Sequence, residues 1–198
     1  MSLRKIPFDN CNDILSRFEL SHETQAIIST ELSPSEALET LQEPKYLLDF
    51  VNFMSHALPV REALTFGLSV INYDNQFSNI SSEAMNATGM EIWQEIRTWI
   101  ISPDEQQRYK IGDLGESLGN DSALGWLCRA VFWNGSGSIV EQKLPVVLPQ
   151  NYLHSKAIFG AIGLCIPQDI DIYDEFCNIV FALGMDIAHG AWPHLSEA

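Results

Sequence analysis

One short motif has the form of the nucleophile site of serine hydrolases. Residues 115–119 read Gly-Glu-Ser-Leu-Gly and match the pattern G-x-S-x-G, in which Ser117 would attack the substrate and a downstream histidine would take its proton. Such a site requires a strand before the serine and a helix after it, whereas a helical pattern precedes Ser117 and a turn at Asn120-Asp121 follows it. We therefore interpret the motif as the glycine-rich end of a helix, with a hydrolase using Ser117 as the alternative.

The residue types that bind metals do not occur at the required spacings. His189 and His194 are five residues apart across a glycine and a proline, and no H-E-x-x-H sequence is present. The acidic run that begins at Asp169 fails as an EF-hand loop because Asp174 stands where the loop needs a glycine. We expect no metal and no cofactor, and we interpret these acids as N-terminal caps of the helix that follows.

Arginine and tryptophan side chains are the strongest candidates for recognition. Arg61 and Arg108 are notable because basic residues are scarce, and a guanidinium can bind an acidic group through two hydrogen bonds. Trp93 and Trp133 border polar faces or loops, and tryptophan is enriched at binding hot spots. Ion pairs within helices and packing in the core are the competing interpretations. We take Arg61, Trp93, Arg108 and Trp133 as the candidate interaction residues.

The charge of the chain restricts its partners. The 198 residues include 26 acidic and 11 basic side chains, which give a net charge of −15. Such a chain repels phosphate, so nucleic acid and anionic membranes are poor partners. No lysine or arginine follows Lys156, and residues 157–198 have a net charge of −6. This acidic stretch is either a solvated face or a surface that attracts a basic protein.

Cysteine usage and hydropathy favour a cytoplasmic location. None of the four cysteines forms a C-x-x-C pair, and three lie in apolar stretches, as reduced and buried thiols do. The first 12 residues contain no apolar signal segment. The longest nearly apolar run, residues 157–167, is too short to span a bilayer, which takes about 20 residues. We expect a cytoplasmic protein without membrane insertion.

Apolar residues recur at helical spacing along almost the whole chain, and strand-type alternation is absent over any useful length. Ser33 and Ser102 are each followed by proline and, three residues on, by glutamate, which predicts two capping boxes. Asp121 is expected to cap a helix that ends near Trp133. We predict an all-α fold, a single-domain antiparallel bundle or array of about eight helices.

The predicted domain spans residues 1–198 and has three parts. Residues 1–43 form two or three short polar helices, residues 44–190 form the core helices, and residues 191–198 form a tail. The helix after Pro59 and the helix over residues 157–166 are apolar on most of their surface, so both are expected to be central, with neighbours packed around them.

One segment between helices is expected to be extended. Residues 134–138 read Asn-Gly-Ser-Gly-Ser, which predicts a flexible turn. Residues 144–149 read Leu-Pro-Val-Val-Leu-Pro, and each proline disfavours helix at the residue before it. Residues 135–149 together form a Pro-containing arm, which either packs on its own chain or exchanges into a neighbouring copy, and the sequence leaves both open.

Several phrases together resemble a known family. They are Leu58–Ala63, Trp99–Pro103 with Arg108, residues 130–138, and the prolines of the arm. Their order over residues 44–166 resembles that of an uncharacterised family of helical proteins found mainly in proteobacteria, some members of which are encoded near type VI secretion genes. The resemblance leaves out the first 43 residues and the last helix. It implies an accessory or interaction role and supplies no catalytic residues.

These observations favour a non-enzymatic protein that binds another protein, which the resemblance associates with a type VI secretion system. A hydrolase using Ser117 is one alternative. A helical bundle that binds a small ligand is the other, and it requires an enclosed apolar pocket with a few convergent polar groups. The sequence does not predict an oligomeric state.

Overall fold

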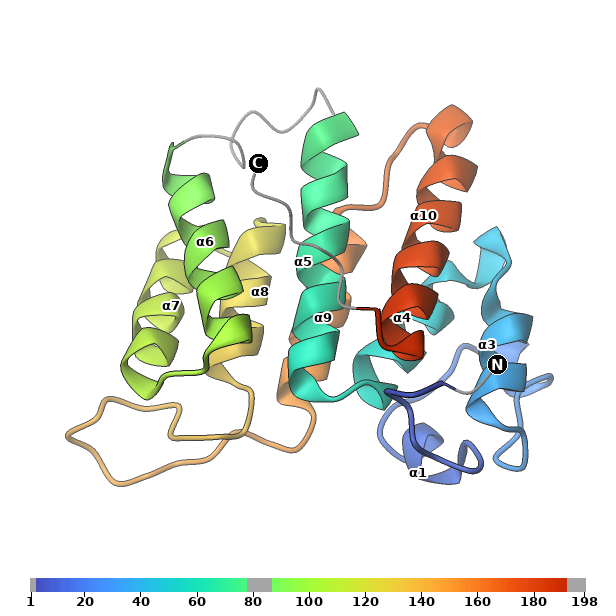
Figure 1. Cartoon of the computed structure of the whole chain (residues 1–198), viewed down its shortest axis with the longest axis horizontal. Helices are drawn as coiled ribbons and strands as arrows, with labels where there is room; N and C mark the ends of the chain where they lie inside the picture. Colours follow the sequence, from blue (N-terminus) through green and yellow to red (C-terminus); the bar gives the residue numbers. More distant parts are fainter. Residues whose placement is uncertain (1–2, 78–86, 192–198) are drawn as a thin grey trace. The chain divides into compact units, whose positions relative to one another are not determined.

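A computed structural model describes residues 3–77 and 87–191 of the chain (Figure 1). Across these residues the backbone forms ten α-helices and one short 3-10 helix, and no β-strand occurs among them. Eight of the α-helices are eight or more residues long. The predicted all-α class is therefore confirmed, as is the expected number of about eight helices.

The helices belong to two compact units. The terminal unit comprises residues 1–66 and 166–198, and the middle unit comprises residues 67–165. Helix α5 (Val60–Phe77) contributes its first turns to the terminal unit and the remainder to the middle unit. A single domain over residues 1–198 stays a prediction.

The terminal unit is built around helices α4 and α10. Gly184 of α10 lies against the ring of Phe50 in α4, so closely that a Cβ atom there would be 2.9 Å from that ring. The Phe50 and Phe181 rings meet edge to face with centroids 4.9 Å apart. The helices of this unit, apart from the start of α5, are α1 (Asn12–Leu15), α2 (His22–Gln25), α3 (Pro34–Leu41), η1 (Pro44–Tyr46), α4 (Leu47–Ala57) and α10 (Ile170–His189).

Two predicted caps are present in the terminal unit. The Ser33 hydroxyl oxygen accepts from the Glu36 amide at 3.3 Å, while the Glu36 carboxylate accepts from the Ser33 amide at 2.9 Å, which completes the capping box at the start of α3. Asp169 caps α10 by accepting from the Asp171 amide at 2.9 Å. Asp169 therefore caps the last helix, as predicted, whereas the other acids of this run lie inside the helix.

The middle unit packs α8 between α7 and α9, with α6 against α7 and α8. Glycines allow the closest approaches, since a Cβ atom on Gly115 of α7 would lie 2.6 Å from the Cys128 side chain of α8. Gly112 lies similarly close to the ring of Phe132. The helices of this unit, apart from the end of α5, are α6 (Ala87–Ile101), α7 (Glu105–Ser117), α8 (Ala123–Phe132) and α9 (Leu153–Leu164).

Two caps in the middle unit differ from those predicted. Helix α7 begins after Asp104, whose carboxylate accepts from the Gln107 amide at 2.9 Å. Ser102 instead continues the last turn of α6, where its amide donates to the Thr98 carbonyl. Likewise Ser122, and not Asp121, caps α8 by accepting from the Gly125 amide at 3.1 Å. Serine and aspartate both serve as N-caps. Where both residues occur close together in the sequence, the pattern does not determine at which of them the helix begins.

Of the two helices expected to be central, only one is enclosed all round. Helix α5 is buried at every residue from Ala63 to Ile71, as predicted. Helix α9 has an open side, because Leu164 is 49% exposed and Lys156 is also exposed. A Cβ atom on Gly163 would meet nothing within 4 Å. The prediction for α9 was wrong because an apolar helix rich in glycine offers little side-chain surface to cover.

The contrast between Gly115 and Gly163 gives a test of this packing. We expect Gly115→Ala to lower the free energy of unfolding by about 2 kcal/mol, because the new methyl group overpacks the α7–α8 contact. Gly163→Ala, the matched control, should raise it by about 0.5 kcal/mol because the site is open and alanine favours helix. Urea titrations followed by circular dichroism measure both changes. Equal stabilities of the two variants would contradict the described contact between α7 and α8.

Candidate functional site

Ser117 does not have the surroundings of a nucleophile. It is the last residue of α7, and its hydroxyl donates to the Leu114 carbonyl at 2.6 Å, as a serine at a helix end commonly does. A helix precedes it where a nucleophile elbow has a strand. The geometry therefore agrees with the glycine-rich helix end and gives the hydrolase alternative no support.

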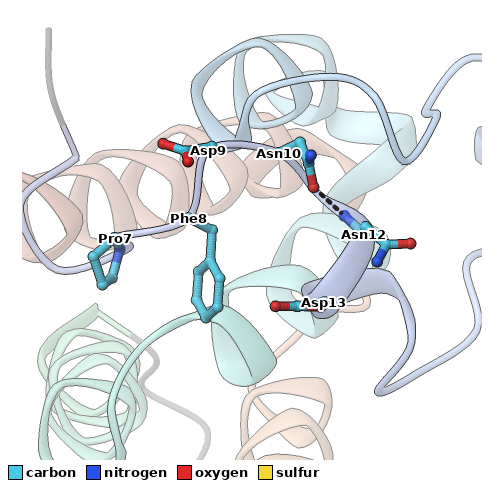
Figure 2. Close-up of a pocket in the computed structure, with 6 residues that line it drawn as sticks. All are labelled: Pro7, Phe8, Asp9, Asn10, Asn12 and Asp13. Atoms are coloured by element: carbon cyan, nitrogen blue, oxygen red, sulfur yellow. Dashed lines mark hydrogen bonds between the residues drawn. The ribbon is translucent and has the colours of Figure 1, made fainter.

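A shallow hollow of about 400 Å³ lies on the terminal unit (Figure 2). It is open to solvent and formed by one continuous segment, in which Asn10 accepts from the Asn12 amide at 3.1 Å. Figure 2 shows the carboxyl groups of the two aspartates well apart. The lining residues are Pro7, Phe8, Asp9, Asn10, Asn12 and Asp13. This polar surface is unlike the enclosed apolar pocket that a small-ligand bundle requires.

The structure describes only one of the two C-terminal histidines. His189 ends α10, whereas His194 lies outside the described residues, as do Trp192 and most of the predicted tail. Within residues 3–77 and 87–191, no three side chains among histidine, cysteine, aspartate and glutamate gather as metal ligands. All four cysteines are buried, and none of them forms a disulfide. Burial raises the pKa of the Cys128 thiol to about 12, so it stays protonated at neutral pH.

The most unusual surface is that of the arm (residues 135–149), which lies between α8 and α9. Figure 1 shows it as a long open loop beyond the ends of α7 and α8. From residue 145 to residue 150 the backbone has neither helix nor turn, as the two prolines predict. Its apolar side chains are Leu144, Val146, Val147 and Leu148, with exposed fractions of 53%, 74%, 47% and 61%. Four adjacent exposed apolar side chains of this size form a patch typical of binding surfaces.

Arg108 anchors the base of this arm to the helices. Its guanidinium is fully buried and binds Glu105 through two hydrogen bonds of 2.7 Å each. It also donates to the carbonyl of Phe132, at the end of α8, and to the carbonyl of Ser138 at 2.8 Å. One side chain thus fixes α7, α8 and the start of the arm together.

Aromatic rings enclose the Arg108 guanidinium. Its central carbon lies 4.6 Å from the ring centroid of Tyr109 and 4.9 Å from that of Phe132. Planar guanidinium groups stack on such rings, which replaces part of the lost hydration. The Tyr109 hydroxyl also donates to the Val140 carbonyl at 3.1 Å and so gives the arm a second attachment to α7.

The turn at the start of the arm depends on two glycines. Asn134 caps it by accepting from the Ser136 amide at 2.7 Å, and Gly135 has the left-handed φ of 93° that favours glycine. A Cβ atom on Gly137 would lie 2.5 Å from the Glu105 carboxylate and 2.7 Å from the Arg108 guanidinium. The chain can pass this ion pair only without a side chain at Gly137.

Electrostatics reinforce the anchor. The hydrogen bonds from Arg108 lower the pKa of Glu105 below its ordinary 4.5, and the Glu105 carboxylate raises the pKa of Arg108. A carboxylate whose pKa is lower in the folded state adds stability above the pKa of the unfolded chain. That contribution is lost as the pH falls through the folded-state pKa, so the anchor weakens only in acid below pH 4.5.

The four candidate residues lie in different settings. Arg108 and Trp133 both lie at the base of the arm, and the half-buried Trp133 ring meets that of Trp126 edge to face at 6.5 Å. Trp93 is 5% exposed in α6 and contacts the Arg97 guanidinium. Arg61 is exposed in the part of α5 that belongs to the terminal unit. Arg108 and Trp133 therefore share the base of the arm, and Trp93 lies in another helix of the same unit.

The exposed apolar side chains of the arm were not predicted as a site. The signal was present, because four of the six residues from 144 to 149 are large and apolar, and prolines make them extended. An apolar run of this kind usually packs inward, and sequence alone does not distinguish that outcome from exposure.

Comparison with known families assigns the chain to one of them. The model of a family described as "Family of unknown function (DUF6931)" matches residues 37–188. The match includes most of α10, so the last helix belongs to the family region, contrary to the narrower span of the resemblance. No curated protein and no solved structure matches the chain.

The anchoring role of Arg108 can be tested directly. We expect Arg108→Met to lower the free energy of unfolding by about 3 kcal/mol, because two carbonyls and the Glu105 carboxylate lose their donors. Cleavage by trypsin after Lys143 in the arm should accelerate about fivefold, since the arm loses its attachment.

The control is Lys110→Met, in the same helix as Arg108, which removes the ion pair between the exposed Lys110 and the half-buried Glu95 of α6. Its effect should stay below about 1 kcal/mol, as for surface pairs in general. Similar losses of stability in the two variants, with unchanged cleavage in both, would show that Arg108 does not hold the arm.

Proposed function

The chain belongs to DUF6931, a family of unknown function, and we propose that it is a non-enzymatic interaction protein that binds another protein through the arm. The observation that carries this proposal is the exposure of Leu144, Val146, Val147 and Leu148 on a segment with a fixed base. Apolar side chains in water cost free energy that a partner recovers when it covers them.

The fixed base favours binding further. A segment already held in an extended conformation loses less conformational entropy when it binds than a disordered one does. Arg108 and Tyr109 attach the start of the arm, while the bond from the Ile139 amide to the Val147 carbonyl, 2.9 Å long, ties its two sides together. The half-buried Trp133 at the same end adds aromatic surface beside the apolar side chains.

Charge selects among partners. A net charge of −15 disfavours nucleic acid and acidic proteins and speeds the encounter with a basic one. No described helix is long and apolar enough to cross a bilayer. We therefore propose a neutral or basic protein as the partner.

The cellular setting rests on the sequence. Four buried thiols without a disulfide agree with the reducing cytoplasm. The resemblance to a proteobacterial family with members encoded near type VI secretion genes supports the further proposal of an accessory role in such a system.

A crosslinking pull-down from native cells tests the proposal. We expect the full chain to recover a specific partner at low and at moderate salt. The triple variant Leu144→Ser, Val146→Ser and Leu148→Ser should recover at least about tenfold less, because each lost apolar contact weakens binding by about 1 kcal/mol or more.

The matched control removes exposed apolar side chains from another part of the chain. Ile170 and Ile172 of α10 are 79% and 44% exposed, and the double variant Ile170→Ser, Ile172→Ser should recover as much partner as the wild type. Circular dichroism verifies that both variants are folded. Recovery that is insensitive to the arm variant, or that fails for the wild type at both salt concentrations, would refute the proposal.

A further inference from the structure

The backbone of the arm is paired on one side only. Both backbone groups of Val147 face the start of the arm, since its amide donates to the Ser138 hydroxyl at 3.1 Å and its carbonyl accepts from the Ile139 amide at 2.9 Å. In an extended chain, the amide and carbonyl of one residue point to the same side, and those of the next residue point to the other. The backbone groups of Val146 and Leu148 therefore point away from residues 138 and 139.

This outward side is unpaired. Within the described part of the chain, nothing forms a hydrogen bond with the backbone groups of Val146 or Leu148. Both side chains are exposed as well, at 74% and 61%. The arm thus presents two amides and two carbonyls at the spacing of a strand edge, next to apolar side chains.

The prolines leave this edge intact. Pro145 and Pro149 are each two residues from Val147, so they share its inward side, and the N–H groups that they lack would have faced inward. Prolines that protect a free strand edge do so by lacking an N–H on the outward side. Here proline keeps the segment extended without removing a donor from the outward edge.

We propose that the arm binds its partner by strand addition, in which an extended segment of a basic protein pairs with the backbone of Val146 and Leu148. This inference rests on the proposed function and specifies its binding mode. Main-chain hydrogen bonds supply affinity in this mode, and the apolar side chains add to it. The partner segment must offer alternating backbone groups and carry lysine or arginine.

Charge makes a basic segment the favoured occupant over a second copy of this chain. Two copies would bring net charges of −15 together, and the middle unit alone carries ten acidic and six basic side chains. Like charges oppose such a pairing, most strongly at low ionic strength. A segment with lysine at alternate positions meets attraction instead.

A synthetic probe tests the binding mode with the full chain. The probe is a fluorescein-labelled octapeptide of alternating valine and lysine, and fluorescence anisotropy reports its binding. We expect saturable binding by the wild type. The same peptide with N-methyl groups on the backbone of every residue should bind at least about tenfold more weakly, because it retains its side-chain charge while both of its edges lose their amide donors.

Variants of the arm locate the contact. Val146→Pro removes an outward amide that has no partner in the free protein, so it should leave the fold intact and weaken binding about tenfold. Pro145→Ala is the matched control: it changes the neighbouring residue and leaves the outward amides intact, and its affinity should stay within about twofold of the wild type. Circular dichroism establishes the fold of both variants.

Each outcome decides between the alternatives. Equal binding of the plain and N-methylated peptides would overturn strand addition, since only charge would then act. If light scattering finds a dimer and Val146→Pro abolishes it, a second copy of the chain is what binds the arm. That result would also overturn strand addition by a basic partner. If the serine variant loses the native partner while Val146→Pro keeps it, strand addition fails and the proposed function stands.

Discussion

The middle unit depends on the satisfaction of one buried positive charge. A guanidinium out of water needs a counter-charge and acceptors for its donors, and Arg108 finds them in Glu105 and in the carbonyls of Phe132 and Ser138. Those carbonyls belong to the end of α8 and to the turn after it, so the chain after α8 must return to α7. This requirement sets the direction in which the arm leaves the helices. Gly137 has no side chain, so the backbone can pass the ion pair of Glu105 and Arg108 there.

A fixed base changes what an exposed apolar segment can do. A flexible loop with four large apolar side chains would collapse onto any nearby surface, whereas bonds from Arg108 and Tyr109 to residues 138 and 140 hold the arm away. Exposed apolar area then remains available in a single conformation. The buried charge and the aromatic rings lie at the base and stabilise it, while the exposed apolar side chains between residues 144 and 148 remain for the proposed recognition.

The helices followed from the sequence because periodic apolar residues and caps are local signals. Ser33 caps its helix as predicted. In the other two helices the caps are Asp104 and Ser122, and not the predicted Ser102 and Asp121, because the residue that caps a helix depends on where the preceding element ends. An ion pair of Arg108 with a nearby acid was a competing interpretation, and Glu105, three residues away, forms it. The two carbonyls, 24 and 30 residues along the chain, lay beyond prediction. No spacing rule connects a side chain to a distant backbone carbonyl, so Arg108 could be singled out by its scarcity but not placed.

The arm shows how far a local rule extends. The prolines correctly predicted an extended segment, because they act on the residue before them. Exposure of the side chains was not predictable, since it depends on the anchor. The two prolines are four residues apart, so in an extended segment they lie on the same side. The hydrogen bonds of Val147 show that this side faces inward. A proline at residue 146 or 148 would have closed the outward edge, and valine and leucine at those positions leave it open to a partner strand.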